Sequence, residues 1–390
     1  MRFIDFFAGI GGFRRGMELA GHRCVGFCEY DKFAVASYTA MHLITDEQYD
    51  YLKTMDMKKR RKEILDEKYR NGEWYAKDIC AVRGADVPEA ECWCFGAPCQ
   101  SFSIAGKRAG LDGESGLIRE IFRLLREKGE EDRPEWIIYE NVKGMFSSNK
   151  GFDYLAILSE MDKLGYDVQW QLFNSKYWGV PQNRERVYTL GHLRAKGFRK
   201  IFPVEREDGQ IGIPGNSVKI HVVCNTKPEN AKRIGYREDV WGARGCAGCI
   251  TATDYKQPRQ VAIPIKEAVK KGYSEAHLGD SINFSYPTST LRRGRIGRQE
   301  AHTLDTSCSQ GIFVPVDEDL SIYARWYENY KSYIAIRRLT PKECFRLQGW
   351  SDDYYERAAF VNSDSQLYKQ AGNGVTVNVV EVIGRALMEE

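Results

Sequence analysis

The N-terminal stretch constrains the fold most, because it has the pattern of a strand, a glycine turn and a helix in that order. Residues 3–8 are a hydrophobic run that continues into Gly9-Ile10-Gly11-Gly12-Phe13. A helix-like stretch follows from Gly12 to Leu19, and Gly21 is placed to end it. This order opens doubly wound nucleotide-type folds, in which glycines let backbone N–H groups approach a ligand at a helix N-terminus. The spacing Gly-x-Gly-Gly differs from the dinucleotide pattern Gly-x-Gly-x-x-Gly, so a plain tight turn is the alternative.

Carboxylates follow the next two predicted strands. Residues 23–27 form an apolar run, and Glu29 lies 20 residues after Gly9. A carboxylate at that distance can accept hydrogen bonds from ribose hydroxyls, although a solvated loop carboxylate is the alternative. Asp78 is predicted to close a third strand end, where its side chain would accept an adenine amino group.

Length and composition limit the class of protein. A chain of 390 residues exceeds one ordinary domain and indicates two lobes, or one domain with a large insertion. No run of about 18 apolar residues occurs, so no membrane span is expected. The N-terminus lacks the basic start and cleavage region of a signal peptide. The eleven cysteines lack the spacing of a small disulfide-bonded domain, so we expect reduced thiols in the cytoplasm.

A single cysteine after a proline ends another apolar segment. Cys92-Trp93-Cys94-Phe95 leads into Gly96-Ala97-Pro98-Cys99-Gln100, which predicts a strand that ends in a turn and presents one thiol. Residues 104–116 hold four glycines and few apolar anchors. Such a stretch is typical of a loop that closes over a substrate. Cys99 is therefore a candidate nucleophile.

A carboxylate and two arginines are candidates for the same site. Residues 136–139 run straight into Glu140, as a buried parallel strand does at its carboxyl end. Ligands bind at that edge of open α/β sheets, so Glu140 is expected to face the same crevice as Cys99. Arg184 and Arg186 alternate in an extended segment, and we interpret them as pointing to opposite faces, one toward the site and one toward a phosphate. A buried structural acid and two surface arginines are the alternatives.

Two segments are strongly charged. Residues 46–74 are helix-prone and contain Lys58-Lys59-Arg60-Arg61-Lys62, which predicts one or two surface helices inserted in a loop, with the basic run on a solvated face. Residues 191–335 carry 22 Lys and Arg against 16 Asp and Glu, a net +6, whereas the rest of the chain carries 35 against 38, a net −3. A basic excess in one segment favours a polyanionic partner, and an ordinary basic surface is the alternative.

Taken together, these stretches resemble the cytosine-C5 DNA methyltransferases of the prokaryotic and phage type, including those of restriction-modification systems. Single motifs of this family are weak evidence, but their ordered set is specific and spans residues 3–380. The matching stretches are Phe7-Ala8-Gly9-Ile10-Gly11-Gly12, Glu29, Asp78, Gly96-Ala97-Pro98-Cys99-Gln100, Glu140-Asn141-Val142, Gln182-Asn183-Arg184-Glu185-Arg186, Arg337-Arg338-Leu339-Thr340-Pro341-Lys342-Glu343 and Gln370-Ala371-Gly372-Asn373-Gly374-Val375.

The resemblance implies an α/β fold. We expect a doubly wound, Rossmann-like, S-adenosylmethionine-dependent methyltransferase domain, formed by residues 1–191 plus 336–390. A smaller and irregular target-recognition domain, residues 192–335, would be inserted before the C-terminal motifs. Residues 375–387 are expected to form a final helix that returns the chain to the first strand.

The resemblance also implies a reaction and its residues. The enzyme would methylate C5 of a cytosine in a specific sequence of double-stranded DNA, after flipping that base out of the helix. Cys99 would add to C6 and make C5 nucleophilic. Glu140 would bond N3 and the exocyclic amine, Arg186 would hold O2, and Arg184 would lie nearer a phosphate.

Cofactor and DNA contacts follow from the same resemblance. Phe7 would stack on the adenine of S-adenosylmethionine. No metal site is expected, because Cys246 and Cys249 form a lone Cys-x-x-C, which favours core thiols over zinc. The cofactor-binding residues are expected to be Phe7, Gly9, Gly11, Glu29, Asp78, Ile79, Gly96, Pro98, Asn373 and Val375. The DNA-binding residues are expected to be Gln100, Ser103, Lys107, Arg292, Arg293, Arg295 and Arg298. A solvated basic loop is the alternative for the four arginines.

Three other functions are weighed against this hypothesis. A relative that methylates cytosine in transfer RNA is disfavoured by Ala97, where the RNA-directed branch has a second proline. A non-catalytic DNA-binding relative is disfavoured because Cys99, Glu140 and Arg186 are all present. A nicotinamide dehydrogenase is disfavoured by the Gly-x-Gly-Gly and Pro-Cys-Gln patterns. We expect a cytoplasmic, nucleoid-associated monomer that binds double-stranded DNA, with any cognate restriction endonuclease acting separately.

Overall fold

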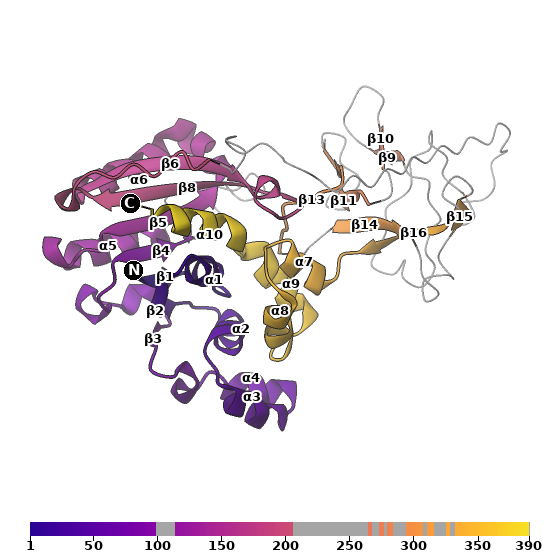
Figure 1. Ribbon diagram of the computed structural model, residues 1–390, viewed down its shortest axis with the longest axis horizontal. Coiled ribbons are helices and arrows are strands. Elements are labelled where there is room, and N and C mark those ends of the chain that lie inside the picture. Colours follow the sequence, from indigo (N-terminus) through magenta and orange to yellow (C-terminus); the bar gives the residue numbers. More distant parts are fainter. Residues whose placement is uncertain are drawn as a thin grey trace.

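The computed structural model has two lobes along its longest axis (Figure 1). The first lobe contains a seven-stranded sheet and both chain termini, and the second contains a five-stranded sheet. The structure describes residues 1–98, 114–205, 264–266, 273–276, 279–283, 294–306, 310–315, 325–327 and 332–389. Among these residues, no helix is both long enough and apolar enough to cross a membrane.

The seven-stranded sheet has the order β3-β2-β1-β4-β5-β8-β6. Its strands are β3 (Trp74–Ala76), β2 (Arg23–Cys28), β1 (Arg2–Phe6), β4 (Cys92–Phe95), β5 (Trp136–Val142), β8 (Glu185–Leu193) and β6 (Tyr166–Asn174). The pairs from β3 to β5 are parallel, and β8 is antiparallel to both of its neighbours. The strand order reverses between β1 and β4, the kind of switch point at which open α/β sheets bind ligands.

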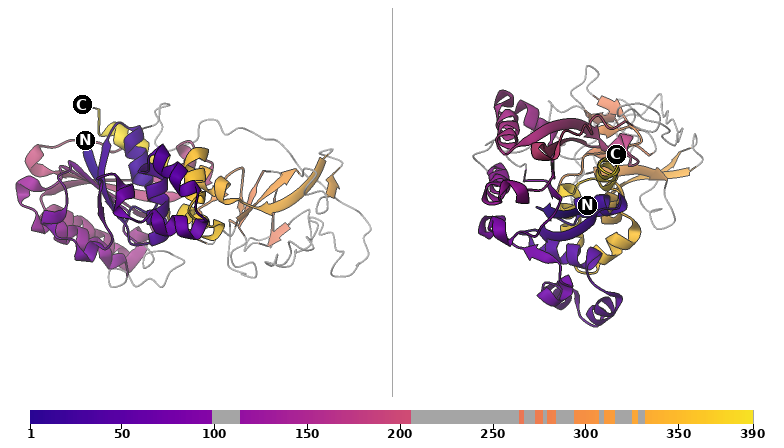
Figure 2. Two further views of the ribbon diagram at one scale, coloured as in Figure 1. Left: turned by 90° about the horizontal axis from the view of Figure 1, so that it is seen from below. Right: turned by 60° about the vertical axis from the view of Figure 1, so that its left-hand side comes forward.

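Helices cover both faces of this sheet (Figure 2). The apolar face that includes Cys92 and Cys94 packs on α1 (Gly12–Leu19) and α10 (Val377–Ala386). The opposite face, with Trp93 and Phe95, packs on α5 (Ile118–Glu127) and α6 (Phe152–Lys163). Successive strand residues point to opposite faces, so a strand buried on both sides is apolar throughout, as β4 is. The fold is therefore the predicted α/β class.

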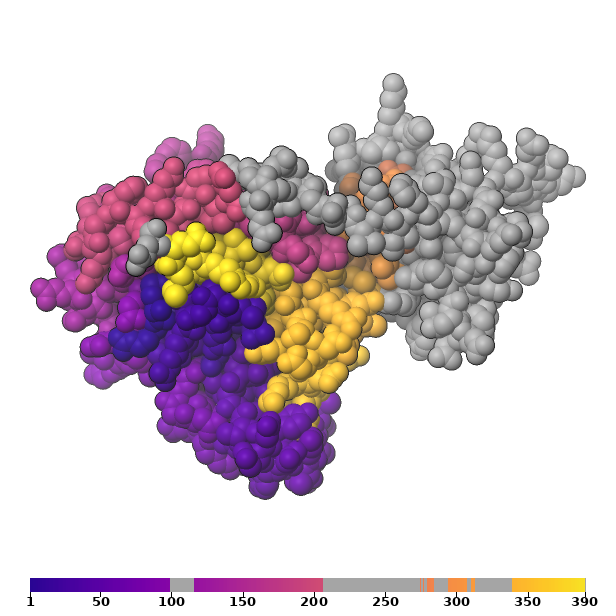
Figure 3. All heavy atoms as spheres, in the orientation of Figure 1, coloured from indigo at the N-terminus to yellow at the C-terminus, as the bar shows by residue number. Residues whose placement is uncertain are grey.

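The C-terminal helix returns to the start of the chain, as predicted. Gly16 of α1 allows close contact, since a Cβ there would lie 2.5 Å from Cβ of Val380 on α10. The Nε2 atom of His22 lies 2.9 Å from the carbonyl oxygen of Gly384. Figure 3 shows α10 beside the N-terminal residues on one face of the molecule, and Figure 2 shows the two termini close together. Both ends of the chain thus belong to one lobe.

Two helices form the predicted charged insert between α2 (Lys32–His42) and β3. They are α3 (Asp46–Lys53), which begins with a capping box, and α4 (Met57–Glu63). The basic run is not solvated throughout. The guanidinium of Arg60 donates to the carbonyl oxygens of Leu52, Met55 and Phe360, at 3.0, 2.7 and 2.6 Å.

Three helices lie between the lobes in Figure 1. They are α7 (Pro341–Arg346), α8 (Asp352–Ala359) and α9 (Asp364–Asn373). Their buried side chains share a core with Ile10 of the first lobe and Leu304 of the second. This helical group therefore joins the N-terminal glycine turn to the second lobe.

The described part of the second lobe contains a regular sheet, where we expected an irregular structure. Its five antiparallel strands are β12 (Ile296–Gly297), β11 (Ser281–Asn283), β14 (Gln310–Pro315), β16 (Ser332–Arg338) and β15 (Arg325–Tyr327). A separate pair comprises β9 (Pro264–Lys266) and β10 (Tyr273–Glu275). The expected domain boundaries at residues 191 and 335 fall inside β8 and β16.

One short pair of strands crosses between the lobes. In it, β7 (Gln182–Asn183) runs parallel to β13 (Ala301–His302). The remaining short elements are the 3₁₀ helices η1 (Glu67–Arg70), η2 (Ile79–Ala81), η3 (Gly84–Asp86), η5 (Glu114–Leu117), η6 (Glu130–Asp132), η7 (Lys143–Gly151), η8 (Ser175–Tyr177) and η9 (Arg194–Lys196).

Candidate active site

The glycine turn after β1 has an unusual backbone. Phe7, Gly9 and Gly11 have φ values of 54°, 56° and 86°, which glycine adopts freely but which strain a phenylalanine. His42 of α2 supports the turn: its Nε2 atom lies 3.0 Å from the carbonyl oxygen of Ile10. Burial lowers the pKa of His42 well below its usual value. A neutral imidazole therefore donates to that carbonyl, which can only accept.

Glu29, just after β2, binds this turn directly. Its Oε2 accepts from the backbone N–H of Gly9 at 2.8 Å, and its Oε1 accepts from the N–H of Asp31 at 2.7 Å. Burial raises the pKa of Glu29, an effect that the backbone donors oppose. A carboxylate oxygen can accept more than one hydrogen bond, so Glu29 retains acceptor capacity for a ligand.

Asp78 and Ile79 follow β3. The Asp78 side chain is exposed and begins η2, where its Oδ1 accepts from the N–H of Cys80 at 3.0 Å. Ile79 is buried. An aromatic side chain that the sequence analysis did not single out, Tyr30, is 68% exposed directly after Glu29, and Nζ of Lys77 lies 5.4 Å from its ring centroid. The signal in the sequence was an aromatic residue directly after the acid predicted to end a strand.

The carboxyl ends of β4 and β5 meet beside the glycine turn that follows β1. A Cβ added to Gly96 would lie 3.5 Å from Oε2 of Glu140 and 3.8 Å from Cγ2 of Val375. Val375 also contacts the start of α1, since a Cβ on Gly12 would lie 2.7 Å from the Val375 carbonyl oxygen. Asn373 is exposed at the end of α9. The structure therefore brings Gly96, Glu140 and Val375 together at one edge of the sheet.

Pro98 is the last described residue before a gap. Cys99 lies outside the described residues, as do three predicted DNA contacts, Gln100, Ser103 and Lys107. Cys99 is three residues beyond Gly96, and three residues span at most about 11 Å. Its sequence position thus keeps the Cα atom of Cys99 within that distance of the Cα atom of Gly96.

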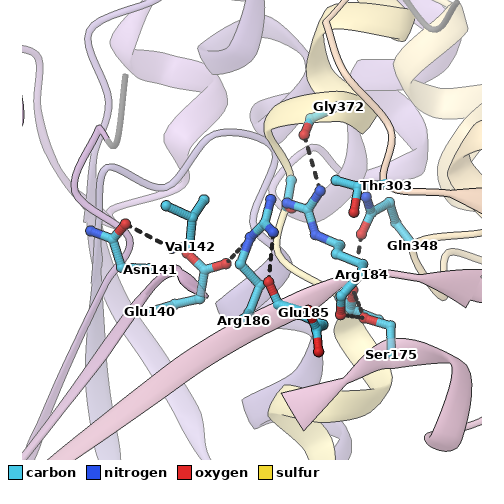
Figure 4. A network of polar contacts seen from close by, with 12 residues as sticks. Glu140, Asn141, Val142, Ser175, Arg184, Glu185, Arg186, Thr303, Gln348 and Gly372 are labelled. Carbon is cyan, nitrogen blue, oxygen red and sulfur yellow. Dashed lines mark hydrogen bonds and ion pairs between the residues drawn. The ribbon is translucent and has the colours of Figure 1, made fainter. Parts of the chain in front are cut away.

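Glu140 forms a buried ion pair with Arg186 (Figure 4). Nε of Arg186 lies 3.0 Å from Oε1 of Glu140, and the two side chains are 14% and 11% exposed. The antiparallel register of β5 and β8 places Arg186 opposite Val142, two residues from Glu140 along β5. Asn141 points to the opposite face, where its amide donates to the hydroxyl of Tyr139. Alternation along β5 thus leaves Glu140 facing Arg186.

Arg184 occupies a different environment. Its side chain is 3% exposed, and its guanidinium donates to the carbonyl oxygens of Gly374 at 2.6 Å and Gly372 at 3.4 Å. These contacts do not support the expected position near a phosphate. The expected opposite orientation of Arg184 and Arg186 is also wrong, since Figure 4 shows both guanidinium groups on the same side of the chain. Residues two apart along an extended strand share a face, whereas adjacent residues alternate.

Comparison with known proteins identifies the family. The family model of the C-5 cytosine-specific DNA methylases matches residues 1–389. The chain belongs to this family. It is a DNA cytosine-5-methyltransferase by that membership, as the ordered motifs predicted.

Relatives match over almost their whole length. Type II methyltransferase M.HhaI from Haemophilus parahaemolyticus is 29% identical over 391 residues, covering 98% of this chain and 93% of that protein. Orphan methyltransferase M.SPRI from Bacillus phage SPR is 26% identical over 465 residues, covering 100% and 97%.

Solved structures share the fold. The Dnmt2 methyltransferase of S. pombe matches with a TM-score of 0.52 and 15% identity, covering 98% of this chain and 96% of that one. The methyltransferase EhMeth of Entamoeba histolytica matches with a TM-score of 0.51 and 16% identity, covering 100% and 99%. At these identities the likeness shows the fold alone.

Of the arginines that we expected to bind DNA in this methyltransferase, the structure describes Arg295 and Arg298, both in the second lobe. Arg292 and Arg293 fall outside the described residues. Arg295 is only 4% exposed, which does not favour a phosphate contact. Arg298 is half exposed, and its Nη1 lies 2.8 Å from Oδ2 of Asp280. Of the four, Arg298 is the described residue whose side chain reaches solvent.

Proposed function

We propose that this methyltransferase transfers a methyl group from S-adenosylmethionine to C5 of a cytosine that is flipped out of a specific sequence in double-stranded DNA. Cys99 would form a covalent bond to C6 during the reaction. The observation that carries the proposal is the buried Glu140–Arg186 ion pair beside Gly96, three residues before Cys99. A cysteine, a carboxylate and an arginine at one sheet edge suit this chemistry.

The proposed reaction changes bonds at C5 and C6 of the cytosine. The Cys99 thiolate adds to C6, and its electron pair makes C5 nucleophilic. C5 then takes the methyl group as the bond between the methyl carbon and the sulfonium sulfur breaks, which releases S-adenosylhomocysteine. A base removes the C5 proton, and the C6–S bond breaks to return the thiolate. S-adenosylmethionine supplies the electrophilic methyl group.

Glu140 and Arg186 would hold the cytosine during these steps. Glu140 would accept hydrogen bonds from the protonated N3 and the exocyclic amine, which favours protonation of N3 as negative charge develops, and Arg186 would donate to O2. Their burial strengthens such contacts, because electrostatic interactions are stronger in a site that excludes water than in bulk water. The ion pair also fixes both side chains before the base arrives, which reduces the cost of orienting them.

The residues around the glycine turn fit S-adenosylmethionine. A Cβ on Gly9 would meet no atom within 4 Å, so the turn leaves open space where a ligand can approach the Gly9 backbone. Glu29 retains acceptor capacity for ribose hydroxyls, and Asp78 is exposed to accept from the adenine amino group. We propose the predicted set as the cofactor site: Phe7, Gly9, Gly11, Glu29, Asp78, Ile79, Gly96, Pro98, Asn373 and Val375.

The second lobe would read the DNA sequence. We propose residues 192–335 as the target-recognition domain and residues 1–191 plus 336–390 as the catalytic domain. The net charge of +6 over residues 191–335 supports this division, because a basic surface binds the DNA backbone. The names of the relatives include both type II and orphan methyltransferases. We propose that this chain methylates DNA as a monomer, with any restriction endonuclease acting separately.

Methyl transfer tests the proposal. We expect labelled methyl groups to pass from S-adenosylmethionine to duplex DNA, and Cys99→Ala to abolish the transfer. A duplex with 5-fluorocytosine at the target should trap the enzyme covalently, because fluorine at C5 cannot leave as a proton. Transfer by Cys99→Ala, or methylation of RNA only, would overturn the proposal. Bisulfite sequencing of the treated DNA would identify the target cytosine.

A further inference from the structure

Arg184 is a buried cation that the proposed chemistry does not use. It lies in the break between β7 and β8, and its guanidinium donates to the carbonyl oxygens of Gly372 and Gly374 at the end of α9. Cations are stabilised at a helix C-terminus, where carbonyl oxygens lack partners within the helix. Arg184 thus anchors the chain before β8 to the helical group between the lobes.

The backbone of Arg184 is held as well. Its N–H donates to Oδ1 of Asn174 at 3.2 Å, and its carbonyl oxygen accepts from the N–H of Ser175 at 3.0 Å. The Ser175 hydroxyl in turn lies 2.9 Å from the hydroxyl of Thr376, the residue before α10. Backbone and side chain therefore tie Arg184 directly to the end of β6 and the end of α9, and through Ser175 to the start of α10.

The second lobe attaches on both sides of this anchor. Just before Arg184, the carbonyl oxygen of Asn183 accepts from the hydroxyl of Thr303 at 2.9 Å, and β7 pairs with β13. On the α9 side, Gly372 packs against the backbone of Asp305, where a Cβ would not fit. Lys176 and Glu300 form a third link, with Nζ 3.2 Å from Oε2. A movement of the second lobe would therefore act on the chain at Arg184.

The chain continues directly from this junction to the active site. Arg186 follows Arg184 by two residues, and its Nε reaches Glu140 at 3.0 Å (Figure 4). If the chain moved at Arg184, β8 would shift relative to β5. Arg186 on β8 would then move away from Glu140 on β5. We propose that Arg184 is a positioning residue, which keeps Arg186 in place against Glu140 while the second lobe bears on DNA.

This inference rests on the proposed function, because it assumes that Glu140 and Arg186 hold the base. The two are judged separately: methyl transfer and trapping by the unaltered enzyme, and their loss in Cys99→Ala, test the function before any Arg184 variant is made.

Arg133 is a matched control. Its Nε donates to the carbonyl oxygen of Leu125 at 2.9 Å and its Nη1 to that of Leu164 at 3.1 Å, so it also binds two carbonyls near helix ends. It does so between α5 and α6, away from the lobe junction. A merely stabilising role predicts the same effects for Arg184→Met and Arg133→Met.

We expect the two variants to differ. Both should lower Tm, but Arg184→Met should lower kcat and the rate of 5-fluorocytosine trapping by about 10- to 100-fold, since small misplacements of a catalytic group have effects of that size. Its Kd for target DNA should stay within about threefold, as the DNA-reading surface is retained. Arg133→Met should keep kcat at temperatures well below its Tm.

Arg184→Lys covers the case in which Arg184→Met does not fold. A lysine keeps the charge but lacks the fork that binds two carbonyls. The kcat of Arg184→Lys should therefore lie between the values for the unaltered enzyme and for Arg184→Met. If Arg184→Met does not fold, the kcat of Arg184→Lys should be about 3- to 10-fold below that of the unaltered enzyme. An unchanged kcat in folded Arg184→Lys would overturn the inference. Equal losses of kcat in Arg133→Met and Arg184→Met would also overturn it.

Discussion

Glu29 follows β2 and Glu140 lies near the end of β5 in the same sheet, yet the two carboxylates have different surroundings. Glu29 accepts from two backbone N–H groups and ties the glycine turn to the end of β2. Glu140 instead pairs with the guanidinium of Arg186. A carboxylate held by backbone amides suits the fixed recognition of hydroxyl groups. A carboxylate held by a single arginine can give up part of its contact with that arginine and form hydrogen bonds to a bound base.

Replacement of Glu140 by glutamine should show how much of its contribution to kcat depends on its negative charge. Glu140→Gln keeps the size but leaves Arg186 without a counter-charge, and we expect kcat to fall by about 10²- to 10⁴-fold, the usual contribution of a residue that assists proton transfer. Steady-state kinetics with duplex DNA would measure the loss. Glu185→Gln is the control, because Glu185 pairs with Lys143 at the surface next to Arg186. A Glu140→Gln enzyme as active as this control would contradict the assigned role.

At the scale of elements, α1 and α10 form the contact that closes the first lobe. The two helices come from opposite ends of the chain, and their side chains share one core with Phe3 and Ile138 of the sheet. Close approach depends on Gly16, whose position against Val380 has no room for a methyl group. Val375, two residues before α10, lies between Gly12 of α1 and Gly96 of the proposed cofactor site.

A paired substitution should reveal this contact. Gly16→Ala should lower the free energy of unfolding by about 1–3 kcal/mol, the usual cost of overpacking. Val380→Ala alone should also destabilise, through a cavity. The double variant should be more stable than the sum of the single effects predicts, because each change relieves the other. Urea unfolding of the four proteins would measure the coupling. Strict additivity would mean that the helices adjust without a clash.

At the scale of the whole molecule, we propose that the first lobe carries out the reaction and the second lobe binds DNA. The described contacts between them are a two-residue strand pair, the helices α7 to α9 and a few polar links. The excess positive charge belongs to the central segment. Such a segment binds the phosphate backbone through release of counterions, which makes binding depend on salt.

The salt dependence of DNA binding should therefore report on the second lobe. Arg292→Gln combined with Arg293→Gln should weaken binding and reduce the slope of log K against log salt by about 1–2, as expected for the loss of one or two phosphate contacts. Fluorescence anisotropy at several salt concentrations would measure the slope. Lys58→Gln combined with Lys59→Gln, on the exposed side of α4, is the control and should leave the slope unchanged. An equal change in both double variants would indicate a general effect of net charge.

Local order was predictable from the residues themselves. The alternation of apolar runs, glycine turns and helix-like stretches predicts the sequence of β1, α1, β2 and β5, because these signals depend on neighbours in the chain. The acids Glu29 and Glu140 were likewise assigned to strand ends from the residues before them. The same local signals predicted the helices of the charged insert and the final helix, and the ordered motifs identified the family.

The tertiary structure alone decided which of these residues meet. Arg186 reaches Glu140 because β8 runs antiparallel to β5 in one register, and a slip of one residue would turn every side chain to the other face. Arg184 reaches α9 because the chain returns there about 190 residues later. Arg295 is buried and Arg298 exposed, although both come from one basic cluster. Local patterns carry no information about such long-range contacts, so the sequence alone determined the elements and the candidate residues, and packing decided their partners.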